Sequence, residues 1–308
     1  QQEEKKNMAL EMVLFAPVPV VTVSVKNAPK FMARLFASDV SKLASGEVER
    51  SVMLNASGGI IGPAYVMRTD VNAYEIVLAG EGADVRQAWI HQVSAAFDAE
   101  LTVTTQTGFY YAGQMPVKEL AVAPMAAKVS EGITFLNLRW ISLVTGPEAN
   151  ITALFDNLIQ AGAKKGEQSG FDALRILARE PAEGLEYDES TTAMEAGFED
   201  VPDFTDPERI FIGRALTEAR FKEGNSPRLH LVAFETAFDP SLLIDVPTII
   251  VGDMACQLTS IARIPEMPLT AGLVSLPAVV KVGENVPCDV KTDPRSFCSK
   301  ALVVDPQI

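Results

Sequence analysis

Residues 133–160 read ITFLNLRWISLVTGPEANITALFDNLIQ and hold the clearest succession of strand and helix signals in the chain. The apolar run from Ile133 to Val144 is typical of a strand. The tetrapeptide Thr145-Gly146-Pro147-Glu148 then fits a capping box, in which the threonine hydroxyl accepts a hydrogen bond from an early helix amide. Apolar residues follow at helical spacing at Ile151, Leu154, Phe155, Leu158 and Ile159. The stretch therefore predicts a strand followed by a helix that ends near Gly162.

Two similar units precede this one. The β-branched run Val20–Val25 predicts a strand, and Pro29 is suited to the first turn of a helix whose apolar positions continue to Leu43, before Gly46. Residues 73–78 predict another strand, and the turn Gly80-Glu81-Gly82 leads into a helix whose buried face includes Val85, Trp89, Val93, Ala96 and Phe97.

The C-terminal third has a different pattern. Apolar and polar residues alternate from Arg228 onward, and residues 248–251 and 273–282 predict further strands. Proline lacks the amide hydrogen that a central strand needs, so the prolines here predict short edge strands, extended arms or polyproline II stretches and no continuous sheet. They are Pro247, Pro265, Pro268, Pro277, Pro287, Pro294 and Pro306. The predicted fold class is α+β (mixed α/β), with strand–helix units in the N-terminal half and a β-rich, proline-punctuated C-terminal region.

An acidic stretch separates these regions. No basic residue lies between Arg179 and Arg209, and many carboxylates occur there: Glu183, Glu186, Asp188, Glu189, Glu195, Glu199, Asp200, Asp203, Asp206 and Glu208. Residues 183–208 therefore predict an exposed loop or connection between a mixed α/β region, 1–182, and a β-rich region, 209–308. Within this acidic stretch, Thr205-Asp206-Pro207-Glu208 predicts a second helix start. Residues 173–178, which precede the acidic stretch, resemble a strand.

Charge and cysteine content narrow the classes of function. Forty acidic against 26 basic residues give a net charge of −14, which argues against direct binding of nucleic acid. The apolar run near Met12 is interrupted by Pro17 and Pro19, so no membrane span is expected. The start, Gln1 to Lys6, is polar and unlike a secretory signal. An odd set of three cysteines favours a reducing compartment, the cytoplasm or a virion.

Few residues suggest a catalytic or metal-binding role. The two histidines, His91 and His230, are interpreted as an exposed helix residue and a surface or interface strand residue. Cys256 could act as a thiol nucleophile, although a buried, inert thiol is more usual. Cys288 and Cys298 could approach across the turn at 292–295, but a zinc site would need two more ligands.

The glycine and carboxylate clusters give no clear sign of a cofactor or metal site. Gly80-Glu81-Gly82 lacks the third glycine of a dinucleotide fingerprint, and Ser57–Pro63 lacks the ending of a phosphate-binding loop, so no cofactor is predicted. Carboxylates at Asp188, Glu189, Asp200 and Asp203 could hold a hard cation, but they lack the spacing of a calcium loop and favour a solvated face. No metal is predicted, and the catalytic residues are left unknown.

These observations favour a structural, self-assembling subunit of a large particle, of the viral or phage shell or tail type. In this hypothesis the protein is not catalytic, and its extended C-terminal segments pair with other copies of the chain. The alternative is a cytoplasmic α/β enzyme or small-ligand-binding protein, with its site near Gly80–Asp84 or Gly252–Cys256. A third interpretation is an acidic adaptor that binds a basic partner through residues 183–208.

Overall fold

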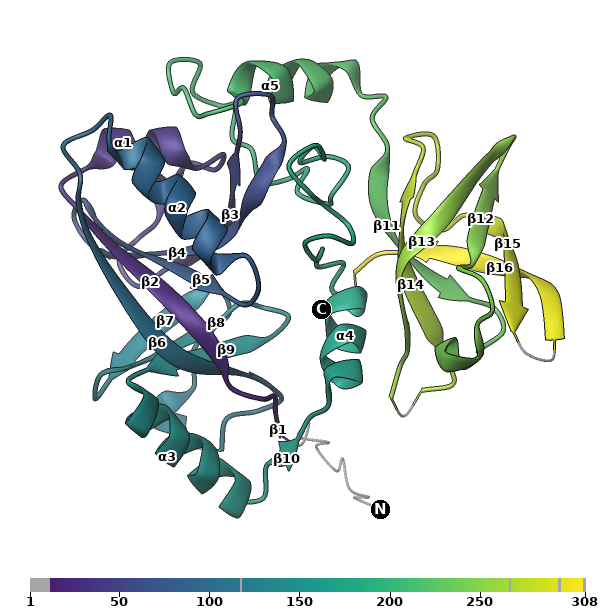
Figure 1. The fold of residues 1–308 in the computed structure, drawn as a ribbon, viewed down its shortest axis with the longest axis horizontal. Helices are drawn as coiled ribbons and strands as arrows, with labels where there is room; N and C mark the ends of the chain where they lie inside the picture. Colours follow the sequence, from purple (N-terminus) through teal and green to yellow (C-terminus); the bar gives the residue numbers. More distant parts are fainter. Residues whose placement is uncertain (1–11, 117, 266, 293–294, 307–308) are drawn as a thin grey trace, which may run out of the picture.

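Two β-structures lie on either side of one central helix, α4 (Gln168–Leu177), in the computed structural model (Figure 1). The structure describes residues 12–306 apart from 117, 266 and 293–294, and the polar start Gln1 to Lys6 lies outside the described residues. Strand–helix units form the first structure, and the second is built almost wholly of strands. The predicted α+β fold class is confirmed.

The first β-structure is a ten-stranded sheet with the order β3-β4-β5-β2-β6-β9-β8-β7, in which β1 pairs with β6 and with β10. Its strands are β1 (Val13–Leu14), β2 (Val18–Lys26), β3 (Val48–Leu54), β4 (Ile60–Asp70), β5 (Ala73–Ala79), β6 (Glu100–Ala112), β7 (Ala126–Ser130), β8 (Ile133–Asn137), β9 (Ser142–Gly146) and β10 (Lys164–Lys165). The sheet curves until its edge strands meet: Ala127 donates a 2.9 Å backbone bond to Gly46, and Val48 donates one of 2.9 Å to Met125.

Both faces of this sheet are covered. On the outer face, Val23 and Val25 of β2 pack in one cluster with α1 (Pro29–Leu35) and α2 (Ala83–Ser94). At the other end, α3 (Glu148–Gln160) places Phe155 edge-on to Phe109, with ring centroids 5.2 Å apart. The inner face, which includes Val20, packs against α4. A strand buried on two faces reads as a continuous apolar run, as β2 does.

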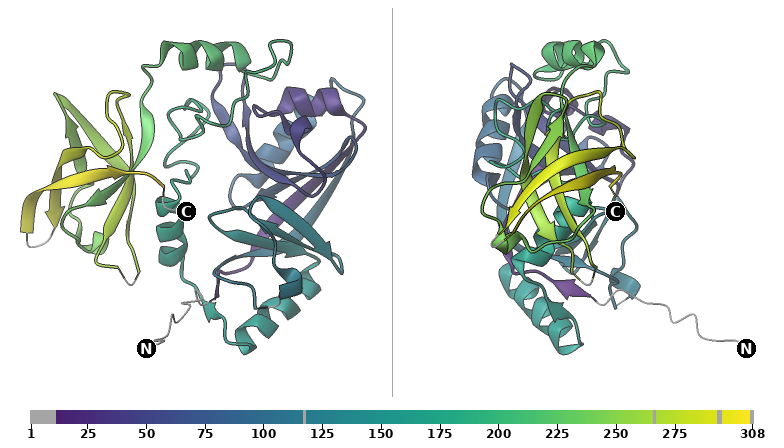
Figure 2. Two further views of the ribbon diagram at one scale, coloured as in Figure 1. Left: turned by 180° about the vertical axis from the view of Figure 1, so that it is seen from behind. Right: turned by 90° about the vertical axis from the view of Figure 1, so that its right-hand side faces the viewer.

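The central helix was not predicted. Residues 173–178 resemble a strand because α4 is apolar on two sides: Phe171 and Leu174 face the large sheet, whereas Ala173 and Ile176 pack against the second β-structure. The whole helix is nevertheless amphipathic, and Gln168 and Ser169 in its first turn are exposed, but the six residues 173–178 are too few to show a helical period. Packing on both sides makes α4 the joint between the two structures (Figure 2).

The second β-structure is a closed barrel with the order β11-β14-β13-β12-β15-β16. Its strands are β11 (Arg228–Phe234), β12 (Thr248–Val251), β13 (Met254–Arg263), β14 (Thr270–Leu276), β15 (Asn285–Thr292) and β16 (Arg295–Val304). Pairing of Leu231 with Val304 and of Phe234 with Ala301 closes it. The predicted arms and edge strands are wrong, because Pro247, Pro268 and Pro277 lie between strands, where no ladder amide is required.

Several local boundaries also differ from prediction. Ile133–Val144 is a hairpin, β8 and β9, and its turn places Arg139 at a φ of 74°. Neither predicted capping box forms: the Thr145 hydroxyl donates to Gln106 and to the Thr107 carbonyl, and α5 (Arg214–Glu223) begins after Gly213. The first helix ends at Leu35, followed by a 3₁₀ turn. The short 3₁₀ turns are η1 (Val40–Lys42), η2 (Lys118–Leu120) and η3 (Pro240–Leu242).

The segment between α4 and α5, residues 178–213, is described in full and has no regular helix or strand. It is nevertheless packed: Phe198 and Phe211 join Val52 and Leu54 of β3 in a buried cluster. The expectation of a wholly exposed acidic loop is therefore wrong for this part of the segment. Among the described helices, none is both long enough and apolar enough to cross a bilayer.

Candidate functional site

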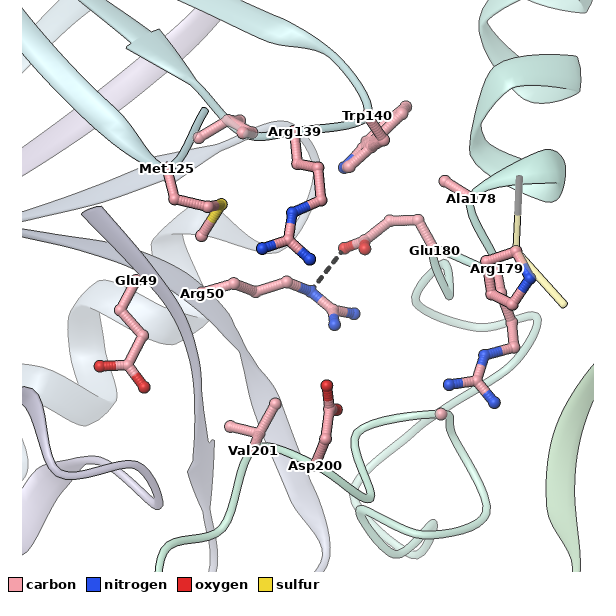
Figure 3. A pocket seen from close by; sticks show the side chains of 13 residues that line it. Glu49, Arg50, Met125, Arg139, Trp140, Ala178, Arg179, Glu180, Asp200 and Val201 are labelled. Atoms are coloured by element: carbon pink, nitrogen blue, oxygen red, sulfur yellow. Dashed lines mark hydrogen bonds and ion pairs between the residues drawn. The ribbon is translucent and has the colours of Figure 1, made fainter. Parts of the chain in front are cut away.

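A cavity of about 350 Å³ lies where the large sheet, the segment after α4 and the end of the barrel strand β16 meet (Figure 3). We call it the Arg50–Glu180 pocket. Its lining residues are Glu49, Arg50, Met125, Leu138, Arg139, Trp140, Ala178, Arg179, Glu180, Gly197, Asp200, Val201 and Pro306. Three parts of the chain, distant in sequence, therefore build one concave site, and its volume is suited to a small ligand.

An ion pair crosses this pocket. Arg50 Nε, on β3, donates a 3.0 Å hydrogen bond to Glu180 Oε1, and the two side chains are only 20% and 14% exposed. The guanidinium carbon of Arg50 also lies 4.1 Å from the centroid of the Phe198 ring. Arg50 Nη2 is buried and has no hydrogen-bond partner among the described residues. A donor left unsatisfied beside a cavity is suited to a ligand acceptor.

The surroundings of Glu180 alter its acidity. Burial raises the pKa of the Glu180 carboxyl above its ordinary value, and the neighbouring Arg50 guanidinium offsets part of that rise. Two tyrosines lie near enough to feel the same charge: burial raises the pKa of Tyr65 well above its usual range and that of Tyr110 to about 12. Their hydroxyls therefore stay protonated at neutral pH, whereas the pKa of the Glu180 carboxyl is shifted upward toward neutral pH.

Two more arginines line the pocket. Arg139 is exposed at the β8–β9 turn, and Figure 3 shows its side chain directed toward Arg50 and Glu180. Arg179 donates a 2.8 Å hydrogen bond to Glu199 and one of 3.2 Å to the Leu229 carbonyl, which ties the pocket wall to β11. With the indole of Trp140 beside them, these groups can bind a small ligand that has a flat ring and an anionic group.

Neither glycine-containing site expected from the sequence lines this pocket. At the β5–α2 turn, the carbonyls of Ala79, Glu81 and Gly82 accept hydrogen bonds from the buried Arg86 guanidinium. This turn is therefore occupied by the protein's own side chain. Gly252–Cys256 forms the β12–β13 hairpin of the barrel.

The histidines and cysteines lie elsewhere as well. His91 is exposed on α2, as expected, but His230 is buried in β11, contrary to the surface position predicted for it. Burial raises the pKa of the Cys256 thiol, which makes it a poorer nucleophile. In the β15–β16 ladder, the main chain of Cys288 is opposite Ser299 and that of Cys298 is opposite Asp289, so these two positions are not directly opposite each other.

The acidic segment divides between three roles. Asp200 lines the pocket, while Asp188 and Asp203 accept hydrogen bonds within local turns, from Ser190 and Thr205. Glu186 is fully buried in a hydrogen-bond network rather than solvated. In the part of the chain that the structure describes, no three His, Cys, Asp or Glu side chains group as metal ligands would.

Sequence reasoning missed Arg50, Arg139, Trp140 and Glu180. None of them belongs to a spaced motif, and the two members of the central pair are 130 positions apart. Arg179 and Glu180 do mark the point where the apolar run of α4 stops. That ending is the sole local signal, and it says nothing of the partner on β3.

The fold has a known counterpart. The structure matches the crystal structure of glycine cleavage system aminomethyltransferase T from Bartonella henselae with a TM-score of 0.80, over 96% of this chain and 85% of that one, at 15% sequence identity. The chain shares that fold. No protein-family model matches the sequence.

Sequence similarity points to the same group of proteins. An aminomethyltransferase of Francisella tularensis subsp. tularensis is 25% identical over 245 residues, which are 73% of this chain and 68% of the relative. An aminomethyltransferase of Francisella philomiragia is 25% identical over 212 residues, 63% of this chain and 59% of that protein.

These likenesses overturn the first functional hypothesis. Proteins similar to this chain along most of its length are named as transferases, and the barrel strands expected to join other copies pair with one another instead. The interpretation as a structural subunit of a viral or phage particle, with a virion location, is wrong. The alternative, an enzyme or small-ligand-binding protein, fits better. Self-association and a basic partner at residues 183–208 stay predictions.

Proposed function

We propose that the chain is a transferase of one-carbon units that resembles aminomethyltransferases, with the Arg50–Glu180 pocket as its site. The observation that carries this proposal is a mostly buried carboxyl of raised pKa in a ligand-sized cavity of a fold shared with an aminomethyltransferase. The proposal keeps the cytoplasm as the compartment, which the odd number of cysteines favours.

Glu180 would handle the proton. Moving a carbon unit from one heteroatom to another requires that the attacking atom lose a proton and that the leaving atom gain one. Because burial raises the pKa of Glu180, this carboxyl accepts and returns a proton closer to neutral pH than an exposed glutamate does. Arg50 would keep the carboxylate form accessible and fix its orientation.

The arginines and Trp140 would bind the substrate. Arg50 Nη2 has an unused donor, and Arg139 and Arg179 add positive charge at the same cavity. These groups support a substrate with a flat ring beside Trp140 and an anionic group beside the arginines. Six of the thirteen lining residues come from the segment after α4, which would shield the reacting atoms from water.

The test is a reconstituted glycine cleavage system in which this chain replaces the aminomethyltransferase and glycine carries a ¹³C label on its methylene carbon. We expect transfer of the label that depends on this chain and is lost in Glu180→Gln. Folded protein that gives no transfer above the system without it would contradict the proposal. Glu183→Gln, an exposed carboxylate three residues away, is the matched control and should transfer the label normally.

A further inference from the structure

We infer that Ser260, on β13 of the barrel, is a positioning residue for Glu180 in the pocket. Its hydroxyl completes a buried network that fixes the main chain on both sides of Glu180. The inference rests on the proposed function only in taking the Arg50–Glu180 pocket as the site. Its test measures the titration of Glu180 and uses no transfer reaction.

Arg175 is the centre of the network. Arg175 Nη1, on α4, donates hydrogen bonds to the Glu180 carbonyl at 2.9 Å and to Glu186 Oε2 at 3.0 Å. The Glu180 amide in turn donates a 2.9 Å bond to the Arg175 carbonyl. One arginine therefore holds both the amide and the carbonyl of Glu180.

Glu186 extends this hold along the chain. Its Oε2 atom accepts a second hydrogen bond, of 2.9 Å, from the Ala182 amide. The turn that follows Glu180 is thereby tied to the same carboxylate that pairs with Arg175. Glu186 has no exposed side-chain surface and Arg175 has only 8%, so the pair has almost no contact with water.

Ser260 is the barrel's contribution. Its hydroxyl donates a 2.5 Å hydrogen bond to Glu186 Oε1 and accepts one of 2.7 Å from Arg175 Nη2. The β13–β14 register shifts between Leu258 and Ser260, and this irregularity adds a residue just before the serine. A buried ion pair is stable only when its remaining hydrogen-bonding atoms are satisfied, and Ser260 satisfies one on each partner.

Removal of this hydroxyl should therefore disturb Glu180. Without the Ser260 hydroxyl, Glu186 Oε1 and Arg175 Nη2 are buried and each lacks the hydrogen bond that Ser260 provided. The turn after Glu180 then shifts, and the contact between Glu180 and Arg50 weakens. The charges that act on Glu180 come from Arg50 on β3, Arg175 on α4 and Asp200 in the segment after α4. Loss of the Arg50 contact, with burial unchanged, raises the pKa of Glu180 further.

Trp140 provides the readout, because its indole lies in the pocket beside Glu180 (Figure 3). The chain has two tryptophans, and the other is replaced by Trp89→Phe on α2. The fluorescence of Trp140 is measured as a function of pH. The transition that is present in the parent and absent in Glu180→Gln is assigned to the Glu180 carboxyl. The variants compared are Ser260→Ala, Ser260→Thr, which keeps a hydroxyl, and Ser275→Ala, which alters a serine on β14 outside the network.

We expect Ser260→Ala to raise the midpoint by about 0.5 unit or more, and Ser260→Thr and Ser275→Ala to leave it unchanged. An unchanged midpoint in folded Ser260→Ala, even with a lower melting temperature, overturns the inference, since a purely structural serine would behave in that way. If Ser260→Ala does not fold, Ser260→Cys replaces it, because a thiol is a weaker hydrogen-bonding group of similar size. No shift in Ser260→Cys overturns the inference equally. Absence of one-carbon transfer would contradict the proposed function and leave this result standing.

Discussion

Arg50 on β3 and Glu180 after α4 are joined by a 3.0 Å hydrogen bond across 130 residues of sequence. The pair attaches the segment that follows the central helix to the inner face of the large sheet. It also separates the two charged groups from bulk water, since both side chains are mostly buried. The stability of this region and the chemistry proposed for the pocket therefore depend on the same contact.

The carboxyl of Glu180 is expected to be essential for turnover. Glu180→Gln retains the size of the side chain but cannot exchange a proton, so label transfer from glycine should fall by about a hundredfold. The measurement is the initial rate in the reconstituted system, with the fold checked by circular dichroism. Equal rates in Glu180→Gln and the control Glu183→Gln would rule out proton transfer by Glu180.

Replacement of Arg50 by lysine should weaken folding although the charge is kept. Lysine has no equivalent of the Nε atom that bonds Glu180, and it lacks the planar group that lies over Phe198. The expected loss is about 1–3 kcal/mol of unfolding free energy, measured by urea denaturation. Arg34→Lys, at an exposed site on α1, is the control and should stay within about 0.5 kcal/mol of the parent.

His230 should make folding weaker in mild acid. Burial lowers the pKa of His230 below its ordinary value of 6.5, and the nearby Arg179 adds to this effect. Between pH 6.5 and the lower pKa of the folded state, the unfolded chain binds this proton and the folded chain does not. The free energy of unfolding therefore falls as the pH is lowered through this range. His230→Gln should flatten this part of the stability profile. The pH dependence of stability in His91→Gln should match that of the parent. If His230→Gln also shows the pH dependence of the parent, the prediction is wrong.

Gly59 should not tolerate a side chain. A Cβ atom there would lie 1.8 Å from the carbonyl oxygen of Glu189, which is backbone and cannot rotate away. Gly59→Ala should therefore separate the β3–β4 hairpin from the segment over it and cost more than about 2 kcal/mol. Gly170→Ala, in α4, is the contrast: its Cβ would meet only Phe15 at 3.8 Å, and helix propensity favours alanine. Similar melting temperatures for the two variants would refute this argument.

Local signals were enough to locate several elements. The β5 strand, its glycine turn and α2 follow from residues 73–97, and β11 follows from the alternation that begins at Arg228. The buried positions were predicted less well: Val85 and Ala96, assigned to the buried face of α2, are exposed, and His230 is buried in β11. The fold class could be predicted because it depends on the order of the elements along the chain and not on single positions.

Local signals failed where a distant contact decides the structure. Thr145 has the sequence of a helix cap, yet its hydroxyl bonds to β6, because the β9 ladder extends to that residue. Residues 173–178 of helix α4 look like a strand because the window is too short to show a helical period, and the layers that pack on its two sides are far apart in sequence. Glu180 gains its significance from Arg50, and no spacing rule connects a residue on β3 with one after α4.

The meeting of β3 and β7 has a consequence for behaviour at high concentration. Where Ala127 bonds to Gly46, each edge of the large sheet saturates peptide groups that would otherwise be open to a foreign strand. In the barrel, β11 and β16 do the same for each other. Both β-structures thereby resist templated aggregation. Loss of the β3–β7 contact would expose an unpaired strand edge at which cross-β association could begin.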